Sequence, residues 1–116
     1  MVVKESSDGD VDRIFQALAD ATRRDIVQRV MAQALSVSAL AVGYAMSFAA
    51  VQKHVAVLER AGLVTKQRQG REQLVHGNPD AVKRASLLLD EYEAIWRGRI
   101  ARMHDIVADD KSGETS

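Results

Sequence analysis

MSFAAVQKHVAVLERAGLVTKQRQGREQLVH, residues 46–76, is the stretch of this chain that decides the fold. Its first half predicts a short helix over 47–61, because apolar residues recur there at helical spacing. Ser47 suits the N-cap, where its hydroxyl can accept a hydrogen bond from an exposed amide of the first turn. Gly62 supplies the left-handed residue that commonly ends a helix. The apolar residues of this helix are Val51, Val55 and Leu58.

Two short runs with strand character follow this helix directly. Residues 63–66 and 73–76 flank a polar tip, residues 67–71, as in a β-hairpin. A helix followed at once by a basic hairpin is the arrangement of a winged helix-turn-helix, whose second helix lies in the major groove of DNA. We therefore expect a mainly α-helical fold with a small β-hairpin that serves as the wing.

Helical patterns continue upstream of this stretch. We predict a first helix that ends near Asp20, a second helix capped by Asp20 or Thr22, and a short third helix capped by Ser36. Residues 43–46 would then form the turn before the helix of 47–61. The side chains expected to face inward from the first three helices are Val11, Ile14, Phe15, Leu18, Ile26, Val27, Val30, Met31, Val37, Leu40 and Ala41.

A long last helix is predicted over about residues 80–109, after the break at Asn78-Pro79. A helix of about 28 residues extends about 40 Å, which is longer than a core this small covers. We therefore expect its apolar stripe to pack on the first helix and on a second copy of the chain. The predicted dimer interface consists of Ile14, Phe15, Leu18, Leu88, Leu89, Tyr92, Trp96, Ile100 and Met103.

The composition indicates one globular domain. With 116 residues, the chain is expected to fold over 10–109, between polar ends 1–9 and 110–116 that we predict to be disordered. The sequence holds no cysteine, which excludes disulfides and thiolate metal sites. No apolar run is long enough to span a membrane, and no secretory leader is recognisable. We therefore expect a cytoplasmic protein with no membrane partner.

The charges are unevenly distributed although they sum to zero. Residues 21–77 carry eight basic and three acidic side chains, and the two ends are acidic. Because phosphate neutralisation depends on local charge, this middle segment suits double-stranded DNA. The alternative is that these charges only solvate helix faces.

The outer face of the predicted helix 47–61 suggests base readout. Ala49, Gln52 and Lys53 fall opposite its apolar side, where Gln52 can reach an adenine edge and Lys53 a guanine or a phosphate. A face that is only solvated usually carries more charge. His54 lies near the border of the apolar side, where a partly buried histidine bound to backbone or phosphate is expected.

Basic side chains elsewhere complete the predicted interface. Arginines at the hairpin tip, Arg68 and Arg71, can enter a narrow minor groove. Arg23 either meets backbone phosphate or pairs with a neighbouring aspartate, and so does Arg24. The predicted DNA-binding residues are Ser47, Ala49, Gln52, Lys53, His54, Lys66, Arg68, Gln69, Arg71 and Arg23.

The sequence offers no constellation for catalysis or for a metal. His104 has no potential co-ligand three or four residues away on its helix, and there is no glycine-rich phosphate loop or serine elbow. We expect neither an enzyme nor a cofactor.

Five segments together resemble the ArsR family of dimeric winged helix-turn-helix regulators. They are FQALADATRR (15–24), LSVSALA (35–41), MS (46–47), AVQKHV (50–55) and LERAGLV (58–64), and the resemblance spans about residues 11–107. The aromatic residues Tyr92 and Trp96 make the last helix similar to that of one branch of the family. The resemblance implies a homodimer formed by the first and last helices, and repression from an inverted-repeat operator that is often the regulator's own promoter.

The chain departs from the family pattern at three places. Ala21 stands where a proline is usual, which predicts a less rigid start of the second helix. Ala45 stands where a glycine is frequent, which predicts strain or an altered turn. The cysteine pair of the metal-sensing branch, expected around 37–42, is absent, as is the His/Asp pattern of the zinc-sensing last helix.

The sequence thus predicts a metal-independent, homodimeric DNA-binding repressor. The alternative is a winged-helix scaffold that binds a partner protein through the long last helix. The sequence does not reveal the operator, the regulated genes, an effector, or whether the effect is repression or activation.

Overall fold

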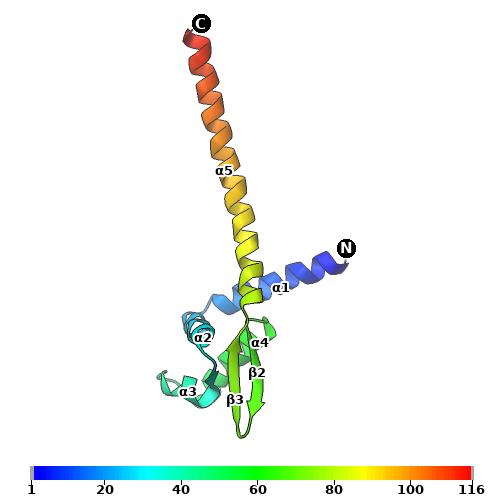
Figure 1. Ribbon diagram of the computed structural model, residues 1–116, viewed down its shortest axis with the longest axis vertical. Helices are drawn as coiled ribbons and strands as arrows, with labels where there is room; N and C mark the ends of the chain where they lie inside the picture. The colour runs from blue at the N-terminus through cyan, green and yellow to red at the C-terminus, as the bar shows by residue number, and fades with distance from the viewer. Residues whose placement is uncertain (1, 116) are drawn as a thin grey trace. The chain divides into compact units, whose positions relative to one another are not determined.

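The computed structural model describes the backbone of residues 2–115 and the side chains of residues 9–107, and its elements are shown in Figure 1. The chain divides into two compact units, one up to Ala85 and one from Ser86 onward. In chain order the elements are α1 (Val2–Leu18), α2 (Ala21–Ala32), β1 (Leu35–Ser36), α3 (Val37–Val42), α4 (Phe48–Arg60), β2 (Val64–Gln69), β3 (Glu72–Gly77) and α5 (Pro79–Thr115).

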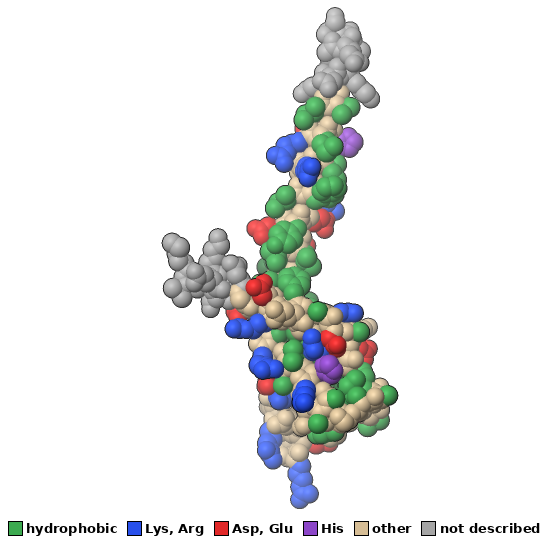
Figure 2. Space-filling view, turned by 180° about the vertical axis from the view of Figure 1, so that it is seen from behind, with side chains coloured by type: hydrophobic (Ala, Val, Ile, Leu, Met, Phe, Trp, Pro, Cys, Tyr) green, Lys and Arg blue, Asp and Glu red, His purple; other side chains and the backbone are tan. Residues whose placement is uncertain are grey.

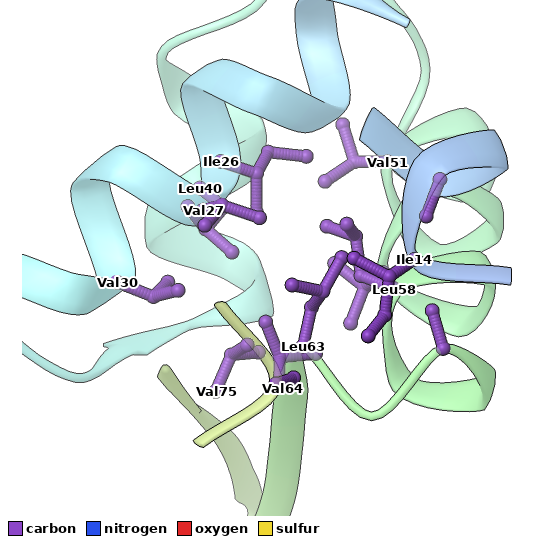
Figure 3. Packing of buried hydrophobic residues seen from close by; sticks show 14 of the residues in the cluster. Ile14, Ile26, Val27, Val30, Leu40, Val51, Leu58, Leu63, Val64 and Val75 are labelled. Carbon is purple, nitrogen blue, oxygen red and sulfur yellow. The ribbon is translucent and has the colours of Figure 1, made fainter. Parts of the chain in front are cut away.

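The first unit closes a core of its own between the helices and the sheet. Apolar side chains from α1 to α4, from the hairpin and from the first turns of α5 meet there, and Figure 3 shows most of them converging. Burial of these side chains is the main stabilising contribution to the unit. The largest of them are Ile14, Ile26, Leu40, Leu58, Leu63, Val51, Val55, Val64 and Val75, each less than 2% exposed.

Helices α2 and α3 begin at side chains that accept amide hydrogen bonds. The Asp20 carboxylate accepts from the Arg23 amide at 3.0 Å, and Ser36 Oγ accepts from the Ala39 amide at 3.0 Å. Both caps were expected from the sequence, with Asp20 rather than Thr22 starting α2. The expected proline position, Ala21, is the first residue of that helix.

The sheet has three antiparallel strands in the order β1-β3-β2. The short strand β1, which pairs Leu35 with Val75, was not predicted, since two residues carry no readable alternation. The hairpin is tighter than predicted, because Gln69 pairs with Glu72 and only Gly70 and Arg71 lie between the strands. Gly70 has a φ of 64°, at the first loop position, where type II′ hairpin turns favour glycine.

The first and last helices are longer than expected. α1 begins at Val2 and α5 ends at Thr115, so helical backbone extends into both segments that the sequence predicted to be disordered. Neither segment contains a proline, so the covalent structure does not stop the helix there. Met1 and Ser116 lie outside the described residues, and the domain limits of 10–109 stay a prediction.

Two side chains that were expected to face inward are partly exposed. Phe15 and Met31 each keep 36% of their surface open to solvent, because each lies at the edge of its helix's buried face. Ile14 is the reverse case. It was predicted to contact a partner, but it has no exposed surface and belongs to the core of its own chain.

The second unit is a single helical segment whose apolar side chains remain exposed. Between residues 86 and 107, most apolar side chains are more than half exposed, among them Tyr92, Trp96 and Met103. Figure 2 shows apolar side chains along this helix. No helix in the described part of the chain is long and apolar enough to cross a membrane.

Candidate nucleic-acid interface

The recognition helix α4 is fixed at both ends and along its inner face. Ser47 Oγ accepts the Ala50 amide at 3.1 Å, as the sequence predicted. At the other end Gly62 adopts a φ of 76°, and the Asn78 side-chain amide donates to the Gly62 carbonyl at 2.8 Å. The buried residues Val51, Val55 and Leu58 hold the helix on the core. This anchoring presents the opposite face of α4 to solvent.

The turn before α4 contacts α2 through Tyr44. The Tyr44 hydroxyl donates to the Asp25 carboxylate, and the Arg29 guanidinium lies 5.4 Å from the centre of the Tyr44 ring. Burial, together with the bond to Asp25, raises the pKa of Tyr44, which keeps the donor protonated. A Cβ at Gly43 would lie 2.8 Å from Arg29 Nη1, so a side chain there would require the guanidinium to shift.

Ala45 does not strain this turn. Within residues 2–115 no residue other than glycine has a positive φ, so the turn requires no left-handed conformation at position 45. The expectation of strain at Ala45 is therefore wrong.

The predicted base-reading residues are exposed on the outer face of α4. Ala49, Gln52 and Lys53 all lie on the surface. Gln52 lines two adjoining hollows, of about 260 and 360 Å³, which lie between the helices and the wing. The first is lined by Val37, Ser38, Phe48, Gln52, Arg68, Arg71, Glu72 and Gln73, and the second by Val37, Ala49, Gln52, Lys53, Val55, Ala56, Lys66 and Gln73.

Among the lining residues that the sequence did not predict for this surface are Phe48 and Gln73. Phe48, the first residue of α4, was overlooked because it precedes the three residues, Val51, Val55 and Leu58, from which the helix was recognised. Gln73 was assigned to a strand, but the sequence did not show which face of the sheet its side chain occupies. The register places Gln73 opposite Arg68, which brings it beside the recognition helix at Gln52.

The wing presents its arginines to solvent, and basic side chains cover its tip, at the bottom of Figure 2. Arg68 and Arg71 are exposed, and Arg68 Nε donates to the Gly70 carbonyl at 3.4 Å. Gln69 is exposed at the last position of β2. Lys66 differs from these residues, because its Nζ lies 3.3 Å from the Glu59 carboxylate. A phosphate would have to compete with Glu59 for Lys66.

Arg23 and Arg24 donate hydrogen bonds to carbonyl groups at the end of α1. Arg23 Nε donates to the Ala17 carbonyl at 2.7 Å, and Arg24 Nη1 donates to the Leu18 carbonyl at 2.8 Å. Carbonyls in the last turn of a helix lack intrahelical partners, and arginine donors satisfy them. Neither of the two uses expected from the sequence, phosphate contact or pairing with aspartate, accounts for these bonds.

His54 faces the α1–α2 junction. Its Nδ1 lies 3.8 Å from the Asp20 carboxylate and 3.5 Å from Arg23 Nη1. The hydrogen bond from the Arg23 amide is the main reason that the pKa of Asp20 lies below its usual value, and Arg23 and His54 add to this through charge. His54 is partly buried, as expected, but its described neighbours are the side chains of Asp20 and Arg23 and not backbone groups, so its contact with phosphate stays a prediction.

Comparison with known proteins agrees with this geometry. A model of a helix-turn-helix domain family matches residues 18–67. The HTH-type transcriptional regulator Rv2034 of Mycobacterium tuberculosis is 34% identical over 99 residues, which cover 85% of this chain and 92% of the relative. A solved structure of an ArsR family transcriptional regulator is 30% identical, with a TM-score of 0.73, and the match covers 77% of this chain and 92% of that one.

This chain belongs to the ArsR family. It is a DNA-binding transcriptional regulator of the winged helix-turn-helix type, not an enzyme. Its fold is also that of a homodimeric winged helix-turn-helix domain from Mycobacterium bovis, solved in solution, at 23% identity and a TM-score of 0.64. That match covers 78% of this chain and 84% of the other.

Proposed function

We propose that this ArsR-family protein is a homodimeric repressor that binds an inverted-repeat operator without requiring a metal. The observation that carries the proposal is the outer face of α4. Gln52 and Lys53 are exposed on a helix whose other side is locked into the core, beside a wing with an exposed Arg68 and Arg71. Such a rigid helix can enter the major groove while the wing contacts the adjacent backbone or minor groove.

The apolar stripe of α5 supports the homodimer. Four apolar residues spaced three or four apart, together with His104, line one hollow on this helix, and most apolar side chains between residues 86 and 107 are more than half exposed. A contiguous exposed apolar surface commonly marks an interaction site. A second copy of the stripe would cover it, and the related fold from Mycobacterium bovis is described as homodimeric. The residues of the hollow are Trp96, Ile100, Met103, His104 and Val107.

The types of residue in the chain support the proposed independence from metal. The sequence has no cysteine, and within the described residues no three His, Asp or Glu side chains gather as a metal site would need. Repression is expected when a dimer occupies an operator that overlaps a promoter. The protein would then act in the cytoplasm, where it meets the operator.

Selection of bound fragments from random DNA tests the proposal. The selected sequences should share an inverted repeat with half-sites about one helical turn apart. Replacing Gln52 by alanine should relax preference at one position of each half-site by about 1–3 kcal/mol. Unchanged preference would refute base reading by Gln52.

Replacing Arg71 by alanine serves as the matched wing variant. It should mainly lower the slope of log affinity against log salt, by about one. In vitro transcription from a promoter that carries the selected repeat then distinguishes repression from activation.

A protein-interaction scaffold remains the second candidate, because the exposed stripe of α5 also suits a different partner chain. A salt titration separates the two functions. A scaffold should show neither a preferred sequence nor a steep dependence of DNA affinity on salt.

A further inference from the structure

Phe48 is a large aromatic residue placed among the polar groups of the DNA-facing surface. It is the first residue of α4 and keeps 46% of its surface exposed, whereas Val51 and Val55 on the same helix are buried. Exposed aromatic surface is unfavourable in water, and the free energy falls when another apolar group covers that surface. The exposed part of the Phe48 ring can therefore contribute to the affinity of a complex in which an apolar group of the partner covers it.

The position of Phe48 limits what that group can be. Phe48 and Gln52 are four residues apart, so they are neighbours on one helix face. Both line the hollow that Arg68 and Arg71 of the wing close from the other side. An apolar protein segment entering there would leave both guanidinium groups without partners, whereas DNA supplies phosphates for them.

We propose that Phe48 reads the 5-methyl group of a thymine next to the base pair that Gln52 contacts. The inference rests on the proposed operator binding and adds a specificity determinant to it. The first turn of a recognition helix is the part that approaches base edges in the major groove. Of the four bases, only thymine presents a methyl group there, and an aromatic ring packs on it.

The experiment removes the methyl group without touching the protein. Each thymine of the selected operator is replaced in turn by uracil, which keeps every hydrogen-bonding group of the pair. Binding of the full-length wild-type protein is measured for each duplex. At one position in each half-site, beside the pair sensitive to Gln52→Ala, affinity should fall about three- to five-fold, as expected for one methyl group left unburied.

Variants then assign this effect to Phe48. In Phe48→Ala the thymine and uracil duplexes should bind equally, and Phe48→Leu should keep part of the difference. Gln52→Ala is the control, since it should lose its adenine preference but keep the difference between thymine and uracil. Circular dichroism and urea unfolding show whether each variant is folded.

The outcomes separate this inference from the proposed function. An operator without thymine at that position, or a wild-type protein that binds every uracil duplex normally, overturns the role of Phe48 while operator binding stands. A uracil effect that persists in Phe48→Ala overturns it too, and assigns the contact to another residue. If no specific duplex is selected at all, operator binding fails and the inference fails with it.

Discussion

The two units of this protein differ in how far they bury side chains of the same kinds. In the first unit Leu58 and Ile26 have no exposed surface, whereas in the second Leu87 and Ile95 are 57% and 64% exposed. The residue types do not differ, but their surroundings do. The first unit surrounds its leucines with four helices and a sheet, and the second is one helical segment. The first unit therefore completes its own core, while the second leaves most of its apolar side chains exposed.

The helices of the first unit are also more firmly fixed, at their ends and along one face, than the helical segment of the second unit. Helices α2, α3 and α4 each begin at a capping side chain, and their inner faces are buried. Along residues 86–107 the described ion pair is the exposed one between Glu93 and Arg97, at 2.6 Å. Such a surface pair contributes at most about 0.5 kcal/mol. Substitutions in both units can test this contrast.

Replacing Leu58 by alanine should have the largest effect. It removes a fully buried side chain and leaves a cavity, so the free energy of unfolding should fall by about 2–5 kcal/mol in urea titration. Leu87→Ala is the matched control in the second unit, where the same truncation of an exposed side chain should cost far less. Equal costs at the two leucines would break the comparison.

Replacing Trp96 by glutamate should dissociate the proposed dimer. A charge placed in an apolar interface is not compensated, so we expect dimerisation about ten- to a hundred-fold weaker, or about 1.4–2.8 kcal/mol. Sedimentation equilibrium measures this, with circular dichroism as the test of folding.

Ala94→Glu is the control for this charge, because position 94 lies on the side of the helix opposite Trp96. Its dimerisation should match that of the wild type. A wild-type protein that is monomeric at all concentrations would assign the stripe to a different partner.

Replacing Ser47 by alanine should have an intermediate effect. The Ala50 amide loses its acceptor, which costs about 1 kcal/mol of stability. Ser47→Asp should restore most of it, because aspartate caps a helix equally well. Ser86→Ala, inside α5, removes a hydroxyl that caps no helix and should change the urea midpoint little.

Replacing Asp20 by asparagine should have the smallest effect, and one that depends on pH. The native pKa of Asp20 is lowered, chiefly by the Arg23 amide, so its charged form contributes stability above the unfolded pKa, about 3.9. That contribution is lost as the pH falls through the lower native pKa. Asparagine keeps a capping oxygen but cannot titrate, so any advantage of the wild type in urea midpoint should shrink between pH 5 and pH 3. A difference that stays constant over this range would show that the charge of Asp20 is not involved.

Local signals in the sequence predicted much of the first unit correctly. The caps at Ser36 and Ser47, the left-handed Gly62 and the start of α5 at Pro79 are all confirmed. Each of these features depends on residues close in the sequence, because a cap or a turn closes within one helical turn. Strand β1 escaped prediction because its two residues are strand only through pairing with β3, some forty residues later.

The candidate site was predicted less completely. The exposed face of α4 with Gln52 and Lys53 follows from helical periodicity alone, and the structure places it as expected. Phe48 was missed because a periodic pattern identifies buried apolar residues, and this one is half exposed at the helix start.

The sequence alone was enough to predict the order of the five helices and the hairpin, the face that α4 buries and the absence of cysteine ligands. Only the tertiary structure decided which basic side chains remain free for DNA. Lys66 meets Glu59, and Arg23 binds carbonyls of α1, whereas Arg71 stays exposed at the tip of the wing. The sequence gives the charge of each side chain but not its partners, because those partners lie on other elements that only folding brings within hydrogen-bonding distance.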